Sequence, residues 1–277
     1  MTDPVPVFPT PGPQVRRVPV DRPWLWLARG WADLLRAPVL SLSVGAIVAA
    51  FSIGLQIATA VSGAIYLALP LTAGFFFVAP LIAVGFYEIS RRLAAGEPVT
   101  GWDFLLAWRR NTAQIALLGL TLMLAHLVWV RIGTLLFALF FAGANPTLER
   151  LVDALIFSPV SISFLVTGTA VGIVLGAVVF SISVISIPML IDRDVGVFTA
   201  MATSLTAVRI NIPAMALWAA LIVGFTVVGM VTFYLGLIVV LPLLGHASWH
   251  AYRDLVEDAK AKPESPEGSG RGRWQLA

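Results

Sequence analysis

The chain has no cysteine and few charged residues. Of its 277 residues, 12% are charged and 58% are hydrophobic. The lack of cysteine excludes disulfides, thiolate metal sites and thiol nucleophiles. A soluble domain usually carries about 25% charged residues, so this chain has too few to cover a water-facing surface. The composition therefore predicts an integral membrane protein.

Long apolar runs fill most of the chain between residues 38 and 252. About 20 apolar residues span a bilayer as a helix, and only helices and closed barrels satisfy their backbone groups there. The runs are too long and continuous for the alternating strands of a barrel. We therefore expect an all-α fold, a polytopic transmembrane helix bundle over residues 21–257.

Six spans are expected, arranged as three helical hairpins. Their approximate limits are 38–58, 62–89, 113–142 and 161–191, and the last two spans share residues 212–252 around a tight turn at Tyr234-Leu235-Gly236. Each hairpin and the stretch before it form one repeat unit, and the units are about 21–95, 96–194 and 195–257. The pattern indicates an ancestral triplication, for which a pseudo-threefold axis normal to the membrane is one hypothesis.

An amphipathic stretch precedes each hairpin. In residues 21–36 tryptophan and leucine recur at helical spacing opposite arginine, which is typical of a helix lying in the membrane interface. The expected apolar stripe is Trp24, Leu27, Ala28, Trp31, Leu34 and Leu35, and the expected polar side is Arg22, Arg29, Asp33 and Arg36. The second stretch is expected to begin with Thr100 as N-cap and Asp103 three residues on. The third covers residues 197–209.

Proline and polar residues dominate both tails. Six prolines in residues 1–20 predict a disordered tail without a cleaved signal peptide. The Lys, Glu, Pro, Ser and Gly content of residues 258–277 predicts a second disordered tail. A short surface helix is expected after Asn145-Pro146.

Basic residues lie on alternate connections. Five arginines precede the first span, four lie between spans two and three, two between four and five, and five basic residues follow span six. Of the other connections, only the third-to-fourth contains a basic residue, Arg150. The positive-inside rule then places both termini in the cytoplasm. Arginine supplies 16 of the 18 basic residues, which suits a GC-rich bacterium, so we expect a bacterial inner-membrane protein. The placement of the basic residues suits the cytoplasmic face of a membrane better than nucleic acid, so no nucleic-acid partner is expected.

Polar residues at the cytoplasmic helix ends form the main candidate site. They are Glu88, Asp192, Asp194, His246, His250 and Arg253. The cluster is either a proton or ion pathway or a collar of polar helix ends, and we favour the collar.

His246 and His250 are one helical turn apart, a spacing that can present two ligands to a metal or haem. His126 is a poor third ligand, because it lies about 24 Å along a helix from Arg110, whereas His246 lies about 10 Å from Arg253. His250 also matches the place of Glu88 in the first repeat unit. An interfacial polar role is therefore preferred, without cofactor or metal, and haem is the alternative.

Small residues at steps of four predict close helix packing. They are Gly168, Gly172 and Gly176 in the fourth span, Ala216, Ala220 and Gly224 in the fifth, and Ser41, Gly45 and Ala49 in the first. Packing inside one bundle is preferred, and a homodimer face is the alternative.

Three segments resemble an uncharacterised family of bacterial integral membrane proteins, a domain of unknown function. They are Asp21-Arg22-Pro23-Trp24, residues 84–92 (VGFYEISRR) and residues 241–255 (LPLLGHASWHAYRDL). The resemblance covers about residues 20–256. Some members carry the label cytochrome c oxidase subunit I, although such a subunit resembles a bundle of about twelve helices with six ligand histidines, and this chain has three histidines.

The sequence favours a non-enzymatic role, since it has no phosphate-binding glycine loop, nucleophile elbow or zinc-protease spacing. We expect a transporter-like component or an assembly or scaffold component. The alternative is a haem- or metal-binding redox protein. The bilayer is the expected partner, together with a second copy or another membrane protein.

Overall fold

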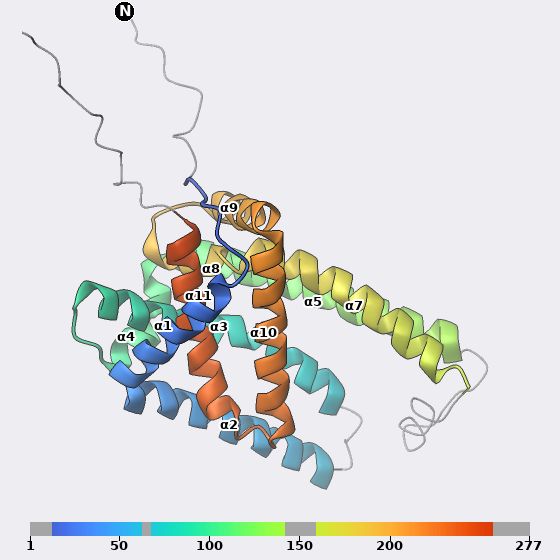
Figure 1. The fold of residues 1–277 in the computed structure, drawn as a ribbon. Coiled ribbons are helices and arrows are strands. Elements are labelled where there is room, and N and C mark those ends of the chain that lie inside the picture. The colour runs from blue at the N-terminus through green and yellow to red at the C-terminus, as the bar shows by residue number, and fades with distance from the viewer. Residues whose placement is uncertain (1–12, 63–67, 142–158, 257–277) are drawn as a thin grey trace, which may run out of the picture.

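The computed structural model describes residues 13–62, 68–141 and 159–256, and its regular elements are all helical (Figure 1). They are α1 (Arg22–Arg36), α2 (Pro38–Val61), α3 (Ala68–Ala95), α4 (Gly101–Leu106), the short 3-10 helix η2 (Ala107–Arg110), α5 (Thr112–Phe141), α7 (Ser161–Ser183), α8 (Ser186–Asp192), α9 (Val197–Ile210), α10 (Ile212–Val231) and α11 (Leu237–Leu255). The short helix predicted after Asn145, the C-terminal tail and residues 1–12 lie outside the described residues.

Four segments are long and apolar enough to cross a membrane, judged by length and composition over the described residues. They are Pro38–Val61, Thr112–Phe141, Ser161–Asp192 and Ile212–Val231. They coincide with the first, third, fourth and fifth predicted spans. The second and sixth predicted spans coincide with helices α3 and α11, and a count of six spans stays a prediction.

Helix α11 is the centre of the fold. Helices α1, α2, α3 and α10 pack around it (Figure 1). Most of its side chains are buried, including Trp249 and Tyr252 near its C-terminal end. Within the described structure α11 is therefore enclosed by protein along most of its length.

Glycines bring the neighbouring backbones close to α11. A Cβ at Gly30 of α1 would lie 2.6 Å from the backbone nitrogen of Ala247, and one at Gly245 would lie 2.8 Å from Cβ of Phe86 in α3. Gly45 of α2 meets the backbone of Ile238 in the same way. Ser41 and Ala49 are buried beside it, so the small-residue stripe predicted in the first span is confirmed.

Helix α1 differs from its predicted stripe. Leu27 and Leu34 are buried, whereas the other four members of the stripe are exposed: Trp24, Ala28, Trp31 and Leu35. Trp26, outside the stripe, is buried and meets Trp218 of α10 edge to face, with 5.7 Å between the ring centroids. Asp33, expected on the polar side, is only 3% exposed. The reason is that α1 packs across α11, whose polar residue His250 binds Asp33.

Helices α5 and α7 form a hairpin that extends away from this core (Figure 1). The predicted fourth span is not one continuous helix, because a turn at Val184-Ile185 separates α7 from α8. Residues 186–191 of α8 are all buried in the core. The apolar run thus divides into a projecting part and a part that packs on α3 and α9.

Both ends of the described chain meet beside α11. The backbone N–H of Arg16 donates to the carbonyl of Leu255 at 2.8 Å, and Val15 pairs with Val256. The side chain of Asn211 bonds the N–H of Val18 at 2.8 Å and the carbonyl of Arg16 at 2.9 Å. Contacts to the core therefore begin inside the stretch assigned to the N-terminal tail.

The turn between α10 and α11 lies where the sequence predicts it. Phe233 and Tyr234 both adopt left-handed backbone, with φ of 56° and 66°, which bulky residues rarely do. Gln56 at the far end of α2 donates to the hydroxyl of Tyr234 at 2.9 Å. This bond ties the turn to α2.

Gly30→Ala is expected to destabilise the protein by about 1–3 kcal/mol, because the added methyl group meets backbone that must move. Gly176→Ala is the matched control, since no heavy atom lies within 4 Å of the Cβ position there, and it should be neutral or stabilising by up to about 1 kcal/mol. Thermal unfolding in detergent measures both. Equal melting temperatures for the two variants would contradict the packing of α1 on α11.

Candidate functional site

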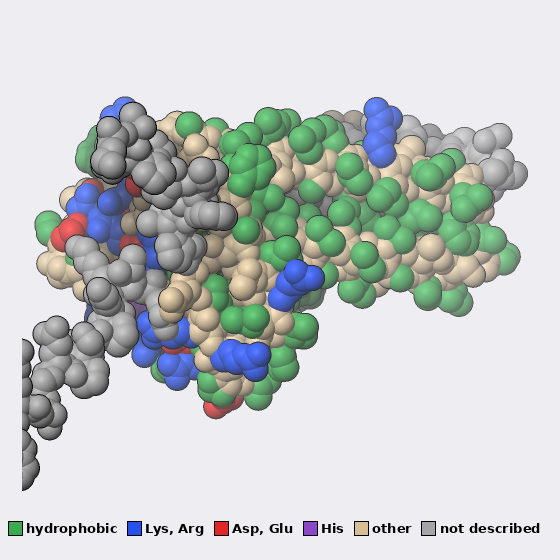
Figure 2. Space-filling model, turned by 90° about the horizontal axis from the view of Figure 1, so that it is seen from above, with side chains coloured by type: hydrophobic (Ala, Val, Ile, Leu, Met, Phe, Trp, Pro, Cys, Tyr) green, Lys and Arg blue, Asp and Glu red, His purple; other side chains and the backbone are tan. Residues whose placement is uncertain are grey.

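Charged residues gather at one end of the molecule. Figure 2 shows the blue and red side chains concentrated over the core, whereas the projecting α5–α7 part is mostly hydrophobic. The end of α3, the end of α8 and the last turns of α11 meet there, together with α1 and the α4–η2 segment. Three ion-paired networks and one histidine-centred network lie in this region.

His246 is fully buried between α2 and α3. Its Nε2 lies 3.0 Å from Oγ of Ser41, and its Nδ1 lies 2.8 Å from Oγ of Ser90. The ring also meets Phe86 edge to face, with 5.3 Å between centroids. Both ring nitrogens therefore have hydroxyl partners, and both serines are fully buried too.

Asp33 connects this histidine network to α1. His250 Nε2 lies 2.7 Å from Oδ2 of Asp33, and Arg36 Nη1 lies 3.6 Å from Oδ1. Burial by itself raises the pKa of Asp33, but the hydrogen bond and charge of His250 and a hydrogen bond from Ser90 outweigh it, so its pKa lies below the usual value. Asp33 is therefore a buried carboxylate.

The charge on Asp33 fixes the direction of the hydrogen bonds. A carboxylate only accepts, so Ser90 donates its hydroxyl proton to Asp33. The oxygen of Ser90 then accepts from Nδ1–H of His246, and the unprotonated Nε2 of His246 accepts from the hydroxyl of Ser41. We call these five residues the His246 junction: Ser41, His246, Ser90, Asp33 and His250.

The two histidines belong to the same junction, but their ring nitrogens bind different partners and do not converge on one ligand position. His246 uses both nitrogens within the junction, and His250 uses Nε2 on Asp33. His126 lies on α5, which packs chiefly on α7. Among the described residues no group of three His, Cys, Asp or Glu side chains is placed to hold a metal ion. Ligation by His246 would require displacing a serine.

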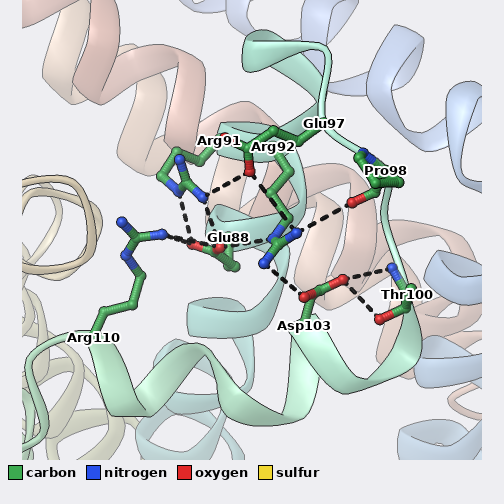
Figure 3. A network of polar contacts seen from close by, with 8 residues as sticks. All are labelled: Glu88, Arg91, Arg92, Glu97, Pro98, Thr100, Asp103 and Arg110. Carbon is green, nitrogen blue, oxygen red and sulfur yellow. Dashed lines mark hydrogen bonds and ion pairs between the residues drawn. The ribbon is translucent and has the colours of Figure 1, made fainter.

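Glu88 is the centre of a network of arginines (Figure 3). The carboxylate is 3% exposed and accepts from Arg91 at 2.9 Å, from Arg92 at 3.0 Å and from Arg110 at 3.1 Å. Arg92 continues to Asp103 at 2.7 Å. The network therefore fastens the end of α3 to α4 and η2.

Asp103 also caps α4. It accepts from the backbone N–H of Thr100 at 2.8 Å and from the Thr100 hydroxyl at 2.7 Å. The hydrogen bond from that hydroxyl is the main reason why the pKa of Asp103 lies below its usual value. The predicted start of this helix at Thr100 is confirmed.

Two further networks bind the last turns of α11. Tyr252 donates to Asp192 at 2.6 Å and accepts from Arg193 at 2.8 Å, and Arg253 reaches Asp192 at 3.2 Å. Asp254 accepts two bonds from Arg22, at 2.6 and 3.0 Å, and one from Trp26 at 2.9 Å. The pKa of Asp254 is lowered, since these bonds outweigh its burial.

The six residues of the predicted polar cluster are therefore divided. Glu88 belongs to the arginine network, Asp192 and Arg253 belong to the Tyr252 network, and the histidines belong to the His246 junction. Asp194 is exposed. The sequence reasoning missed Asp33, Ser90, Tyr252 and Asp254 as partners. The polar residues in the second half of α11 were a signal, because a helix with that many polar groups needs polar neighbours if it is buried.

The predicted packing residues of α7 and α10 lie mostly on open faces. Gly172 approaches the Trp129 ring at 3.2 Å from its Cβ position, whereas Gly168, Gly176 and Gly224 have nothing within 4 Å in the described structure. Ala216 and Ala220 are exposed. Close packing at these residues stays a prediction.

These observations define a multi-pass integral membrane protein. Residues 68–192 match the family described as predicted integral membrane protein DUF2189, whose function is unknown. The expected resemblance to such a family is confirmed over this segment, which includes the whole Glu88 network. No curated protein and no solved structure matches the chain.

Glu88→Gln is expected to destabilise the protein by about 3–5 kcal/mol, because three arginines lose the buried charge that neutralises them. Glu97→Gln is the control, since Glu97 is 43% exposed and should change stability by less than about 1 kcal/mol. Urea or thermal unfolding in detergent provides the comparison. The assigned role of Glu88 fails if the two variants are equally stable.

Asp33 is expected to contribute stability that depends on pH. A carboxyl whose pKa is lower in the folded state stabilises the fold above its unfolded pKa of about 3.9, and this contribution is lost as the pH falls through the folded pKa. Asp33→Asn should therefore be less stable than wild type at about pH 6, and the gap should narrow at about pH 3. Thermal unfolding of both proteins between about pH 3 and 6 measures this gap. A difference in melting temperature that stays constant over the range would show that Asp33 does not contribute the pH dependence inferred here.

Proposed function

We propose that the protein is a non-enzymatic, transporter-like membrane component that moves protons through the His246 junction. The observation that carries the proposal is the continuous hydrogen-bonded chain from half-buried His250 to fully buried Ser41, across four helices. Ionisable groups placed deep in a membrane protein are costly, so their presence favours a functional use.

The His246 junction differs from the three carboxylates around it in the kind of side chain that binds the carboxylate. Glu88, Asp192 and Asp254 are paired with arginines, which keep their charge at every physiological pH. These pairs suit a fixed structural role. The junction instead contains histidine and serine side chains, whose groups can both donate and accept a proton in hydrogen bonds.

Proton movement follows the donor-to-acceptor order. Ser41 donates to His246, His246 to Ser90, and Ser90 to Asp33. One concerted shift along these bonds delivers a proton to Asp33. Ser41 takes up a proton from the transport pathway as it gives its own to His246, so no serine alkoxide forms, and Asp33 releases its proton before the next turnover. Neutralising Asp33 also weakens its pair with Arg36 on the same helix and its bond to His250, and the loss of the His250 bond loosens α1 from α11. This coupling suits a transporter in which helix packing changes with protonation.

The proposal includes six spans, with α3 and α11 added to the four long apolar segments. Both termini would lie in the cytoplasm of a bacterial inner membrane, which the distribution of basic residues supports. The three stretch-and-hairpin repeats remain part of this proposal. An assembly role is a second candidate, favoured by the exposed small residues Ala216 and Ala220 on α10.

Proton flux into liposomes tests the transport role. Vesicles containing the purified protein and a trapped pH-sensitive dye should equilibrate an imposed pH gradient faster than empty vesicles. His246→Asn keeps a donor toward Ser90 but removes the nitrogen that accepts from Ser41. It should therefore slow the protein-dependent rate by about a hundredfold or more, the lower end of the range for a lost proton-transfer group. His126→Asn on α5 is the control and should keep the wild-type rate.

Two results would contradict the proposal. In the first, vesicles with the wild-type protein equilibrate a pH gradient of either direction no faster than empty vesicles. In the second, His246→Asn gives the same rate of proton flux as wild type. Tight vesicles for all variants would favour the assembly role.

A further inference from the structure

A groove opens beside α2, at the boundary between α1 and the first candidate span. It has a volume of about 460 Å³. One wall is the segment where α1 ends and α2 begins. The other wall is the end of α3 together with the loop that leads to α4. The residues used below are Arg36, Val39, Leu40, Leu93, Glu97 and Val99. The groove is separate from the α10–α11 turn and from the projecting hairpin.

The position of the groove corresponds to the edge of a bilayer. Pro38, which also lines it, is the first residue of a 24-residue apolar segment. Trp31 of α1 and Trp102 of α4 are 45% and 71% exposed on the flanking helices. Tryptophan with arginine is typical of the level where hydrocarbon meets water. The groove therefore lies where lipid headgroups and upper acyl chains are found.

The lining combines both charges with an apolar floor. Arg36 is 63% exposed and Glu97 is 43% exposed, so each can bind a further partner in addition to its ion pair within the protein. Val39, Leu40, Leu93 and Val99 supply the apolar surface. A ligand that matches this lining has an anionic group, a cationic group and an apolar tail.

We infer that the groove binds a phospholipid with a primary-ammonium headgroup, the phosphatidylethanolamine class. Arg36 binds the phosphate, for which a guanidinium is well suited. Glu97 accepts hydrogen bonds from the ammonium, and the apolar lining takes the first carbons of the acyl chains. Choline lipids lack an N–H for Glu97, and glycerol headgroups lack the cation. This inference does not rest on the proposed proton transfer at the His246 junction, and the experiment below tests it separately.

Native mass spectrometry of the detergent-purified protein tests the inference, with ethanolamine, glycerol and choline phospholipids of identical acyl chains added in turn. The ethanolamine lipid should bind about tenfold more tightly than the others, as expected for one charge-assisted contact. Glu97→Gln should remove this preference, while Arg36→Gln should weaken all three lipids. Arg36→Lys should retain most of the binding. Arg29→Gln on the exposed side of α1 is the control and should bind as wild type.

Equal binding of the three lipids to wild type would overturn the inference, since it indicates a non-selective lipid shell. It would also be overturned if Arg36→Gln and Glu97→Gln both bind the ethanolamine lipid as wild type does. Addition of water-soluble glycerophosphoethanolamine should leave the lipid bound. Displacement by this headgroup alone would show that the apolar floor contributes nothing and would refute the assigned lipid.

Discussion

The close packing of α11 against α1, α2 and α3 is the constraint on which the rest of the structure depends. Gly30, Gly45 and Gly245 let the backbones approach so closely that polar groups on four helices come within hydrogen-bonding distance. With wider spacing, His246 and Asp33 would be buried without partners, at a cost of about 1–3 kcal/mol or more for each group. Small residues therefore determine both the packing and the polar chemistry of the core.

The polar end of the molecule stabilises buried charge in two different ways. Around Glu88 and Asp254, arginine neutralises a carboxylate and ties a helix end to its neighbours. Such pairs hold one protonation state over a wide pH range. Around Asp33, histidine and serine bind the carboxylate instead. The arginine pairs provide a rigid frame, and in the proposed role the protons of the His246 junction would move within that frame.

The sequence predicts the helices better than their environment. The limits of α2, α5 and α10, the cap at Thr100 and the turn at Tyr234 follow from apolar runs and local turn chemistry. Helical spacing also separates the two sides of α1, but it does not indicate that α11 covers the side with Asp33. The polar residues of α11 look like a helix end in water when they are considered alone. Their burial depends on partners distant in sequence, such as Ser41 and Ser90, which no local pattern identifies.

Arg36 links the two proposed sites, because it lines the groove and also pairs with Asp33 at 3.6 Å. A phosphate that draws Arg36 away would leave Asp33 with one cation fewer, which raises the affinity of Asp33 for a proton. By linkage, protonation of Asp33 would release Arg36 and strengthen phosphate binding by the same factor. That factor is small, since the Arg36 side chain is 63% exposed and solvent screens its pairing. Lipid binding at this groove would therefore adjust the proton equilibrium of the junction without controlling it.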